Sequence, residues 1–142
     1  MSTQTGHCLC GAVAYRGKGG LHMHVCHCSN CRRWTGSPAM TLTFDDGMDI
    51  LTPDNVRWYG SSDWAERGSC ATCGSTLFYR MPDSGYINVS AGSLDDQSAI
   101  DGIAEHIFVD EKPLHYDFAG EAPRITGAEV FERFTGPQDG QS

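Results

Sequence analysis

The chain has 142 residues and a mass of 15.4 kDa, a length that fits one small domain. Its 18 acidic and 10 basic residues give a net charge of −8 at pH 7, the opposite sign to that of a typical nucleic-acid-binding protein. No apolar run is long enough to predict a membrane span. A hydrophobic content of 39% with 17 glycines predicts a small core that needs disulfides or metal to stabilise it.

Alternating apolar and polar residues predict a series of short strands, each bounded by Gly, Pro, Asp or Asn. In chain order they cover residues 13–15, 21–25, 40–44, 76–80, 86–89, 106–109 and 130–134. Short helical turns are expected at 29–35, with Ser29 as the cap, and at 95–100. The pattern predicts a mostly β single domain of small antiparallel sheets over residues 1–135, followed by a flexible tail at 136–142.

The seven cysteines fall into three clusters: Cys8-x-Cys10, Cys26-x-Cys28-x-x-Cys31 and Cys70-x-x-Cys73. An odd number cannot pair fully into disulfides, and the polar residues 1–6 do not look like a secretory signal. We therefore expect a cytoplasmic location, where close cysteine pairs bind metal more often than they form disulfides. Zinc is the first choice for all-thiolate ligation there.

The cysteine spacings predict two zinc ions per chain. Cys26, Cys28 and Cys31 lie within six residues and can hold one ion by themselves. The remote pairs then complete a four-sulfur structural site that closes a long loop. Three protein ligands leave a fourth position open, as a catalytic zinc requires.

The spacing leaves other arrangements open. Cys8 and Cys10 can combine with Cys28 and Cys31, which leaves Cys26 unused. A [4Fe–4S] cluster on some of the cysteines is a further alternative. Both zinc sites can also be structural, with His27 or another side chain as the fourth ligand of the three-cysteine site.

Four segments resemble the glutathione-dependent formaldehyde-activating enzyme family, which also contains relatives of centromere protein V. They are residues 6–15 (GHCLCGAVAY), 26–33 (CHCSNCRR), 70–77 (CATCGSTL) and 89–95 (VSAGSLD), and the resemblance extends over about residues 6–117. It implies a β-tent fold with a structural zinc on Cys8, Cys10, Cys70 and Cys73. It also implies a catalytic zinc on Cys26, Cys28 and Cys31.

The resemblance also implies an activity. The family joins formaldehyde to glutathione as S-(hydroxymethyl)glutathione, and the reverse reaction is that of a carbon–sulfur lyase. The expected partners are a small thiol and an aldehyde, without nucleic acid or membrane, and a homodimer stays open. One departure is His115, which stands about where the family often carries a tryptophan.

The two carboxylates of glutathione require positive charge in an otherwise acidic chain. Arg32 and Arg33 directly follow Cys31 and are the candidates, because a guanidinium pairs with a carboxylate through two hydrogen bonds. At most one of two adjacent residues on a turn should face the site. His106 is expected to be a satisfied sheet residue, with acid–base chemistry as the less favoured role.

Two alternatives to an enzyme fit the same residues. One is a zinc-stapled binding module without catalysis. The other is a thiol-based redox sensor that uses the three-cysteine cluster.

Overall fold

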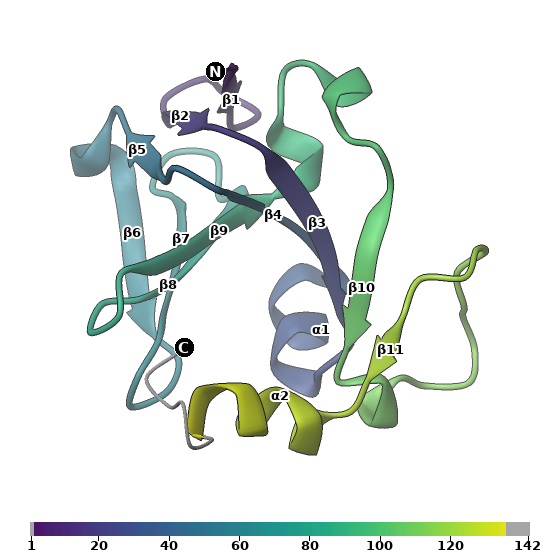
Figure 1. Ribbon diagram of the computed structural model, residues 1–142. Coiled ribbons are helices and arrows are strands. Elements are labelled where there is room, and N and C mark those ends of the chain that lie inside the picture. The colour runs from purple at the N-terminus through teal and green to yellow at the C-terminus, as the bar shows by residue number, and fades with distance from the viewer. Residues whose placement is uncertain (1, 136–142) are drawn as a thin grey trace. The chain divides into compact units, whose positions relative to one another are not determined.

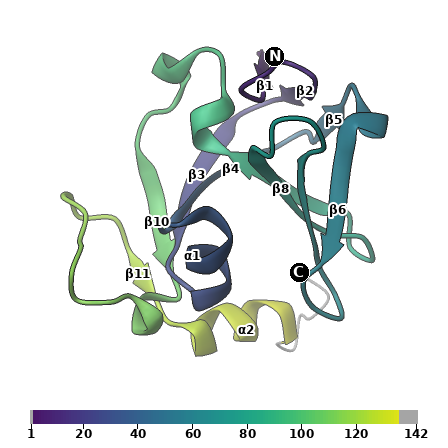
Figure 2. The same cartoon turned by 180° about the vertical axis from the view of Figure 1, so that it is seen from behind.

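A computed structural model describes residues 2–135, so the expected tail at 136–142 lies outside the described residues. The chain forms two compact units. Unit 1 combines the segment up to His22 with Thr41–Asp101, and unit 2 combines Met23–Met40 with the chain from Gly102 onward. Strands predominate over the two α-helices (Figures 1 and 2), which confirms the expected mostly β fold class.

Unit 1 contains two sets of antiparallel strands. In the first, β2 (Ala14–Lys18) lies between β1 (Thr3–His7) and β5 (Met48–Ile50). The second has the order β4-β9-β8-β7-β6. Its strands are β4 (Ala39–Phe44), β6 (Val56–Gly60), β7 (Glu66–Cys70), β8 (Thr76–Met81) and β9 (Tyr86–Ser90). A 3-10 turn at Pro53–Asn55 precedes β6, and two more at Ala91–Ser93 and Gln97–Ala99 follow β9. The last confirms the turn expected at 95–100.

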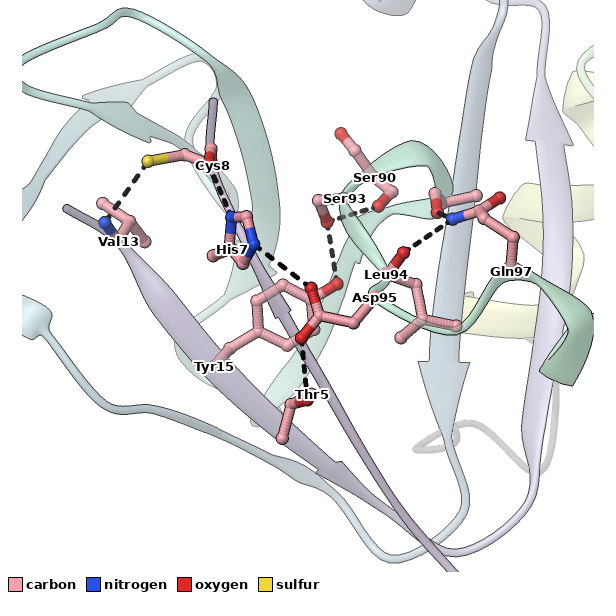
Figure 3. Close-up of polar contacts among 11 residues, drawn as sticks. Thr5, His7, Cys8, Val13, Tyr15, Ser90, Ser93, Leu94, Asp95 and Gln97 are labelled. Carbon is pink, nitrogen blue, oxygen red and sulfur yellow. Dashed lines mark hydrogen bonds and ion pairs between the residues drawn. The ribbon is translucent and has the colours of Figure 1, made fainter. Parts of the chain in front are cut away.

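The core of unit 1 is built around Tyr15, which is completely buried. Its ring meets the ring of Phe78 edge to face at a centroid distance of 5.9 Å. Its hydroxyl lies 2.7 Å from the Ser93 hydroxyl, which in turn donates to the Ser90 carbonyl at 2.7 Å (Figure 3). A buried hydroxyl with a partner avoids the desolvation cost of an unpaired polar group, so this chain of bonds fixes the turn after β9.

Unit 2 has parallel strands, so the expectation of antiparallel pairing throughout was wrong. β10 (Ile103–Ile107) lies between β3 (Leu21–Cys26) and β11 (Arg124–Ile125) and is parallel to both. Parallel neighbours need long connections, and the chain between β3 and β10 passes through unit 1 before it returns. Residue alternation predicts a strand but carries no information about its direction.

Two helices complete unit 2. Helix α1 (Ser29–Thr35) was predicted from the sequence, although its N-cap is Cys28 and not Ser29. Helix α2 (Gly127–Thr135) replaces the strand predicted at 130–134, which was therefore wrong. Val130 and Phe134 are four residues apart, a spacing that places them on one helix face. No helix of the described chain is long and apolar enough to cross a membrane.

The start of α2 has a capping box that the strand interpretation overlooked. The Thr126 hydroxyl accepts the Glu129 N–H at 3.2 Å, and the Glu129 carboxylate accepts the Thr126 N–H at 2.8 Å. These reciprocal bonds satisfy backbone donors that have no partner within the helix. Farther along α2, Arg133 donates two hydrogen bonds to Glu105 of β10, at 2.8 and 3.0 Å. Sequence-local and tertiary contacts therefore both favour the helix.

Gly6 provides a test of the unit 1 core. A β carbon at this position would overlap the Tyr15 ring and come within 2.6 Å of the Ser93 carbonyl oxygen. We expect Gly6→Ala to lower the free energy of unfolding by about 2 kcal/mol or more in urea titrations, because an overfilled core must shift its backbone. The matched control is Gly60→Ala, where the added carbon meets nothing within 4 Å and the change should stay within about 1 kcal/mol. Equal effects of the two substitutions would contradict this account of the core.

Candidate metal centres and substrate pocket

Four cysteines of unit 1 come together although 60 residues separate Cys10 from Cys70. The sulfur atoms of Cys8, Cys10, Cys70 and Cys73 all lie within 4.8 Å of one another. The Cys8–Cys10 and Cys10–Cys70 sulfur pairs are each 3.7 Å apart. Four sulfurs at 2.3 Å from a central zinc form a tetrahedron with edges of about 3.8 Å, so the group has the dimensions of a metal site.

The backbone around this cluster points N–H groups at the sulfurs. Val13 donates to the sulfur of Cys8 at 3.3 Å, and Thr72 and Cys73 donate to the sulfur of Cys70 at 3.4 Å. Gly74 closes the turn with φ 81°, a conformation that glycine adopts without steric cost. The Cys70-x-x-Cys73 segment thus forms a tight turn that brings both of its sulfurs into the cluster.

Thr5, His7 and Asp95 form a polar triad at β1, the strand that precedes Cys8 of the four-cysteine cluster. The Asp95 carboxylate accepts a hydrogen bond from the Thr5 hydroxyl at 2.8 Å and lies 3.4 Å from His7 Nε2 (Figure 3). His7 Nδ1 donates to the Cys8 carbonyl at 2.8 Å. That bond, with the Asp95 carboxylate, raises the pKa of His7. The triad joins β1 to the segment after β9 at the point where Cys8 leaves the strand.

The second cluster forms in unit 2 where β3 ends and α1 begins. Cys26 is the last residue of β3, Cys28 is the N-cap of α1 and Cys31 lies in its first turn. Their sulfurs lie within 4.8 Å of one another, and the Cys31 N–H donates to the Cys28 sulfur at 3.4 Å. The Glu111 carboxylate accepts the Ser29 N–H at 2.8 Å and holds the start of the helix. A strand-to-helix junction therefore supplies all three ligands from one short segment, and Glu111 supports the helix start from a distant one.

His27 points away from these three sulfurs. Its ring is fully buried, with Nδ1 2.9 Å from the Tyr116 hydroxyl and Nε2 2.9 Å from His106 Nδ1. With both ring nitrogens engaged, His27 has no atom left for a metal. Within residues 2–135 no other Cys, His, Asp or Glu joins the three cysteines. The cluster thus has three protein ligands, and the alternative with His27 as the fourth is not supported.

The acid–base properties of both clusters suit a cation. Hydrogen bonds from Cys28 and Cys31 hold the pKa of Cys26 far above its ordinary value. In the other cluster, hydrogen bonds from Ser75 lower the pKa of Cys73 to about 5. The Ala12 N–H lowers the pKa of Cys10, but burial and the neighbouring thiols together raise it to about 11. Neighbouring thiols resist losing all their protons unless a positive ion compensates the charge, so the residues of each cluster fit a metal ion.

The grouping of the sulfurs decides which cysteines combine, one of the questions that the spacing left open. Cys8 and Cys10 join Cys70 and Cys73, and Cys26 lies with Cys28 and Cys31. The combination of Cys8 and Cys10 with Cys28 and Cys31 was therefore not the one adopted.

A pocket of about 540 Å³ lies in unit 2. Its wall is formed by Arg32, Gly36, Ser37, Pro38, Met40, His115, Tyr116, Asp117 and Phe118. Arg32 of the pocket wall directly follows Cys31, so the pocket adjoins the three-cysteine cluster. Burial raises the pKa of Tyr116. The pocket and the three sulfurs together form the candidate active site.

The two candidate arginines separate as expected for adjacent residues. Arg32 lines the pocket, and its Nε donates to the His27 carbonyl at 3.1 Å. Arg33 is exposed and is not part of the pocket wall. His115 does line the pocket, where its ring meets that of Tyr116 edge to face at 5.3 Å.

Comparison with known proteins now decides the family. Residues 3–111 match the family model described as glutathione-dependent formaldehyde-activating enzyme. The chain belongs to this family. An uncharacterized lyase of Schizosaccharomyces pombe is 31% identical over 136 residues, which cover 93% of this chain and 97% of the relative. The resemblance recognised in the sequence is confirmed.

One solved structure is also similar. It is the crystal structure of a Rhodobacter sphaeroides protein, with a TM-score of 0.48 and 22% sequence identity. The match covers 84% of this chain and 98% of that chain.

Sequence reasoning did not identify Tyr116 as a site residue. Tyr116 lies 89 positions from His27, and no local motif links them. His106 was expected to be a satisfied sheet residue, and it is buried and bonded to His27. The available signal was the presence of His27 and His106 next to apolar strand residues, since a buried imidazole needs a polar partner.

Metal content tests the division into two clusters. We expect Cys26→Ser to remove one metal ion per chain and leave the circular dichroism spectrum unchanged, because its cluster is formed by one local segment. Cys70→Ser should remove the other ion and lower the melting temperature, because its cluster joins segments 60 residues apart. Metal would be counted by plasma mass spectrometry on purified variants. Loss of both ions from the Cys26→Ser protein would contradict two independent clusters.

Proposed function

We propose that the chain is a zinc-dependent carbon–sulfur lyase that forms and breaks S-(hydroxymethyl)glutathione or a similar thiol–aldehyde adduct. The observation that carries the proposal is the cluster of Cys26, Cys28 and Cys31 beside a pocket, without a fourth cluster ligand among the described residues. A closed structural site has four protein ligands, whereas a catalytic site keeps one position open. Family membership and the lyase relative support the same reaction class.

The reaction sets three requirements. A thiol sulfur adds to the carbonyl carbon of the aldehyde, the C=O π electrons move to oxygen, and the thiol proton ends on that oxygen. The site must therefore favour the thiolate over the thiol, bind the aldehyde and transfer one proton to the aldehyde oxygen. The thiolate requirement is the hardest, since a free thiol with a pKa of about 8.5 is only a few per cent ionised at pH 7.

Cys26, Cys28 and Cys31 would hold the zinc ion. When bound, zinc supplies a positive centre that lowers the pKa of a nearby thiol. Tetrahedral thiolate ligation and the absence of redox chemistry make zinc the metal that suits this donor set. Cys8, Cys10, Cys70 and Cys73 would hold a second zinc with a structural role.

Arg32 is the residue proposed to bind a carboxylate of glutathione. Its bond to the His27 carbonyl fixes the plane of the guanidinium at the pocket wall. Within the described chain its two terminal nitrogens take part in no hydrogen bond or ion pair, so they are available to a ligand. A guanidinium fixed in this way can make two parallel hydrogen bonds to one carboxylate. The pocket volume of about 540 Å³ lies within the range of small-molecule sites.

Exchange spectroscopy on glutathione mixed with formaldehyde tests the activity. Adduct formation is spontaneous, so the expected result is an exchange rate that rises in proportion to added protein. Cys28→Ser protein should abolish this rise, because it loses a thiolate of the three-cysteine cluster. No acceleration at micromolar wild-type protein would overturn the lyase proposal and leave a binding module.

The adjacent arginines form a matched pair for the binding site. We expect Arg32→Met to weaken glutathione binding about tenfold or more, since it removes a charge-assisted hydrogen-bond donor. Arg33→Met removes the same charge from an exposed position and should change the dissociation constant less than about twofold. Calorimetric titration measures both. Equal weakening by the two substitutions would indicate a general charge effect and contradict the assignment of Arg32.

A further inference from the structure

A row of three hydrogen-bonded side chains ends at the pocket. The Tyr116 hydroxyl lies 2.9 Å from His27 Nδ1, and His27 Nε2 lies 2.9 Å from His106 Nδ1. Both histidine rings are buried, at 0% and 2% relative exposure, whereas Tyr116 lines the pocket. The three residues come from the end of β3, from β10 and from the segment before β11.

Packing fixes the orientation of this row. The His27 ring stacks on Tyr116 with 18° between the ring planes, and Phe118 meets His27 edge to face at 5.7 Å. Phe118 also packs against His106 at a centroid distance of 5.1 Å. In β10, His106 pairs with Val25 of β3 on one side and with Arg124 of β11 on the other. Neither imidazole can turn away from the row without losing these contacts.

The hydrogen atoms in this row have two arrangements. A hydrogen bond needs one donor and one acceptor, so each 2.9 Å contact holds one hydrogen. In the first arrangement Tyr116 donates to His27 Nδ1, and His27 Nε2–H donates to His106 Nδ1. In the second, His106 donates to His27 Nε2, and His27 Nδ1–H donates to the Tyr116 oxygen. The second arrangement leaves the hydroxyl hydrogen of Tyr116 without a partner in the row, and Tyr116 is a residue of the pocket wall.

The geometry points to the Tyr116 hydroxyl, positioned by His27 and His106, as the acid–base group that protonates the aldehyde oxygen when the carbon–sulfur bond forms. This inference rests on the proposed lyase function. The sulfur electron pair forms the bond to carbon, the C=O π pair moves to oxygen, and this oxygen takes the Tyr116 proton. The phenolate then regains the proton that the thiol released to solvent. Cleavage of the adduct follows the same path in reverse.

Other polar groups on the pocket wall are less suited to this step. Asp117 forms an ion pair with Arg124 at 2.9 Å, and the Ser37 hydroxyl donates to the Pro38 carbonyl at 3.1 Å. Arg32 is the residue proposed to bind a carboxylate of glutathione. His115 is the rival, since it lines the pocket and carries an imidazole ring. It is exposed, however, and its only described ring contact is with Tyr116 itself.

The first test compares Tyr116→Phe with His115→Phe by exchange spectroscopy on glutathione and formaldehyde. Tyr116→Phe keeps the ring and removes the hydroxyl, and we expect kcat to fall about 100-fold with little change in KM. His115→Phe also alters the pocket wall and should lower kcat, but by less than about tenfold, because the proton donor is retained. Metal content should be that of wild type in both variants.

The second test separates positioning from folding. His106→Leu removes the ring nitrogen that faces His27, so kcat should fall as in Tyr116→Phe protein. His106→Asn places an amide group where Nδ1 stood and should restore most of the rate. If His106 had only a structural role, kcat of both variants would instead fall in proportion to their loss of stability. Urea unfolding measures that stability independently.

The third test does not depend on turnover. S-(methoxymethyl)glutathione is a stable analogue with an oxygen where the adduct has its hydroxyl oxygen, and S-propylglutathione has the same length without that oxygen. We expect wild-type protein to bind the ether about three- to tenfold more tightly, as one hydrogen bond allows. Tyr116→Phe protein should bind both analogues equally.

The outcomes distinguish the two claims. A wild-type protein that accelerates exchange, combined with an unchanged kcat in Tyr116→Phe, would overturn the role of Tyr116 while the lyase function stands. Loss of acceleration in His115→Phe alone would overturn it too and assign the step to His115. A wild-type protein without any acceleration would overturn the lyase function and this inference together.

Discussion

The constraint on which this structure depends is electrostatic: thiols held close together cannot all ionise without a positive ion. The seven cysteines are divided between two clusters, and within each cluster the sulfurs lie within 4.8 Å of one another. Neighbouring thiols raise the pKa of Cys26 far above its ordinary value. The Cys26 thiol therefore keeps its proton unless a positive ion binds to the cluster. Metal ions bound to these clusters would cross-link a small, acidic, glycine-rich chain and so stabilise a fold whose apolar core is modest.

The two clusters are built in different ways, and the difference matches their proposed roles. Cys70 ends β7 and Cys73 lies in the turn after it, whereas Cys8 and Cys10 follow β1. Their site therefore closes a long loop within unit 1. The cluster of unit 2 arises from one strand-to-helix junction, with α1 supplying two of its ligands. The pairing of β3 with β10 and the capping of α1 are made by the chain itself, so we expect both to survive the loss of an ion from this cluster.

The sequence was informative wherever contacts are local. Spacings of two and three residues predicted the local cysteine clusters, and the segment at 29–35 predicted α1. The combination of Cys8 and Cys10 with Cys70 and Cys73 was left open by spacing and was implied by the family resemblance. The sequence did not predict two contacts between remote segments. These are the parallel pairing of β10 with β3 and the hydrogen bond between Tyr116 and His27. The helix at Gly127–Thr135 was missed for a different reason. Apolar residues at 130 and 134 fit a strand and a helix equally well, and only the capping box of Thr126 and Glu129 separates them.

We propose that the three-cysteine cluster is the catalytic metal site and that the four-cysteine cluster is a structural one. Stepwise removal of metal by a mild chelator tests it directly, with metal content, circular dichroism and the glutathione–formaldehyde exchange rate measured on the same samples. The account predicts that the acceleration disappears with the first equivalent of metal released, while the spectrum stays that of the folded protein. Acceleration that persists after the first equivalent has left, or a fold that is lost together with it, would contradict the account.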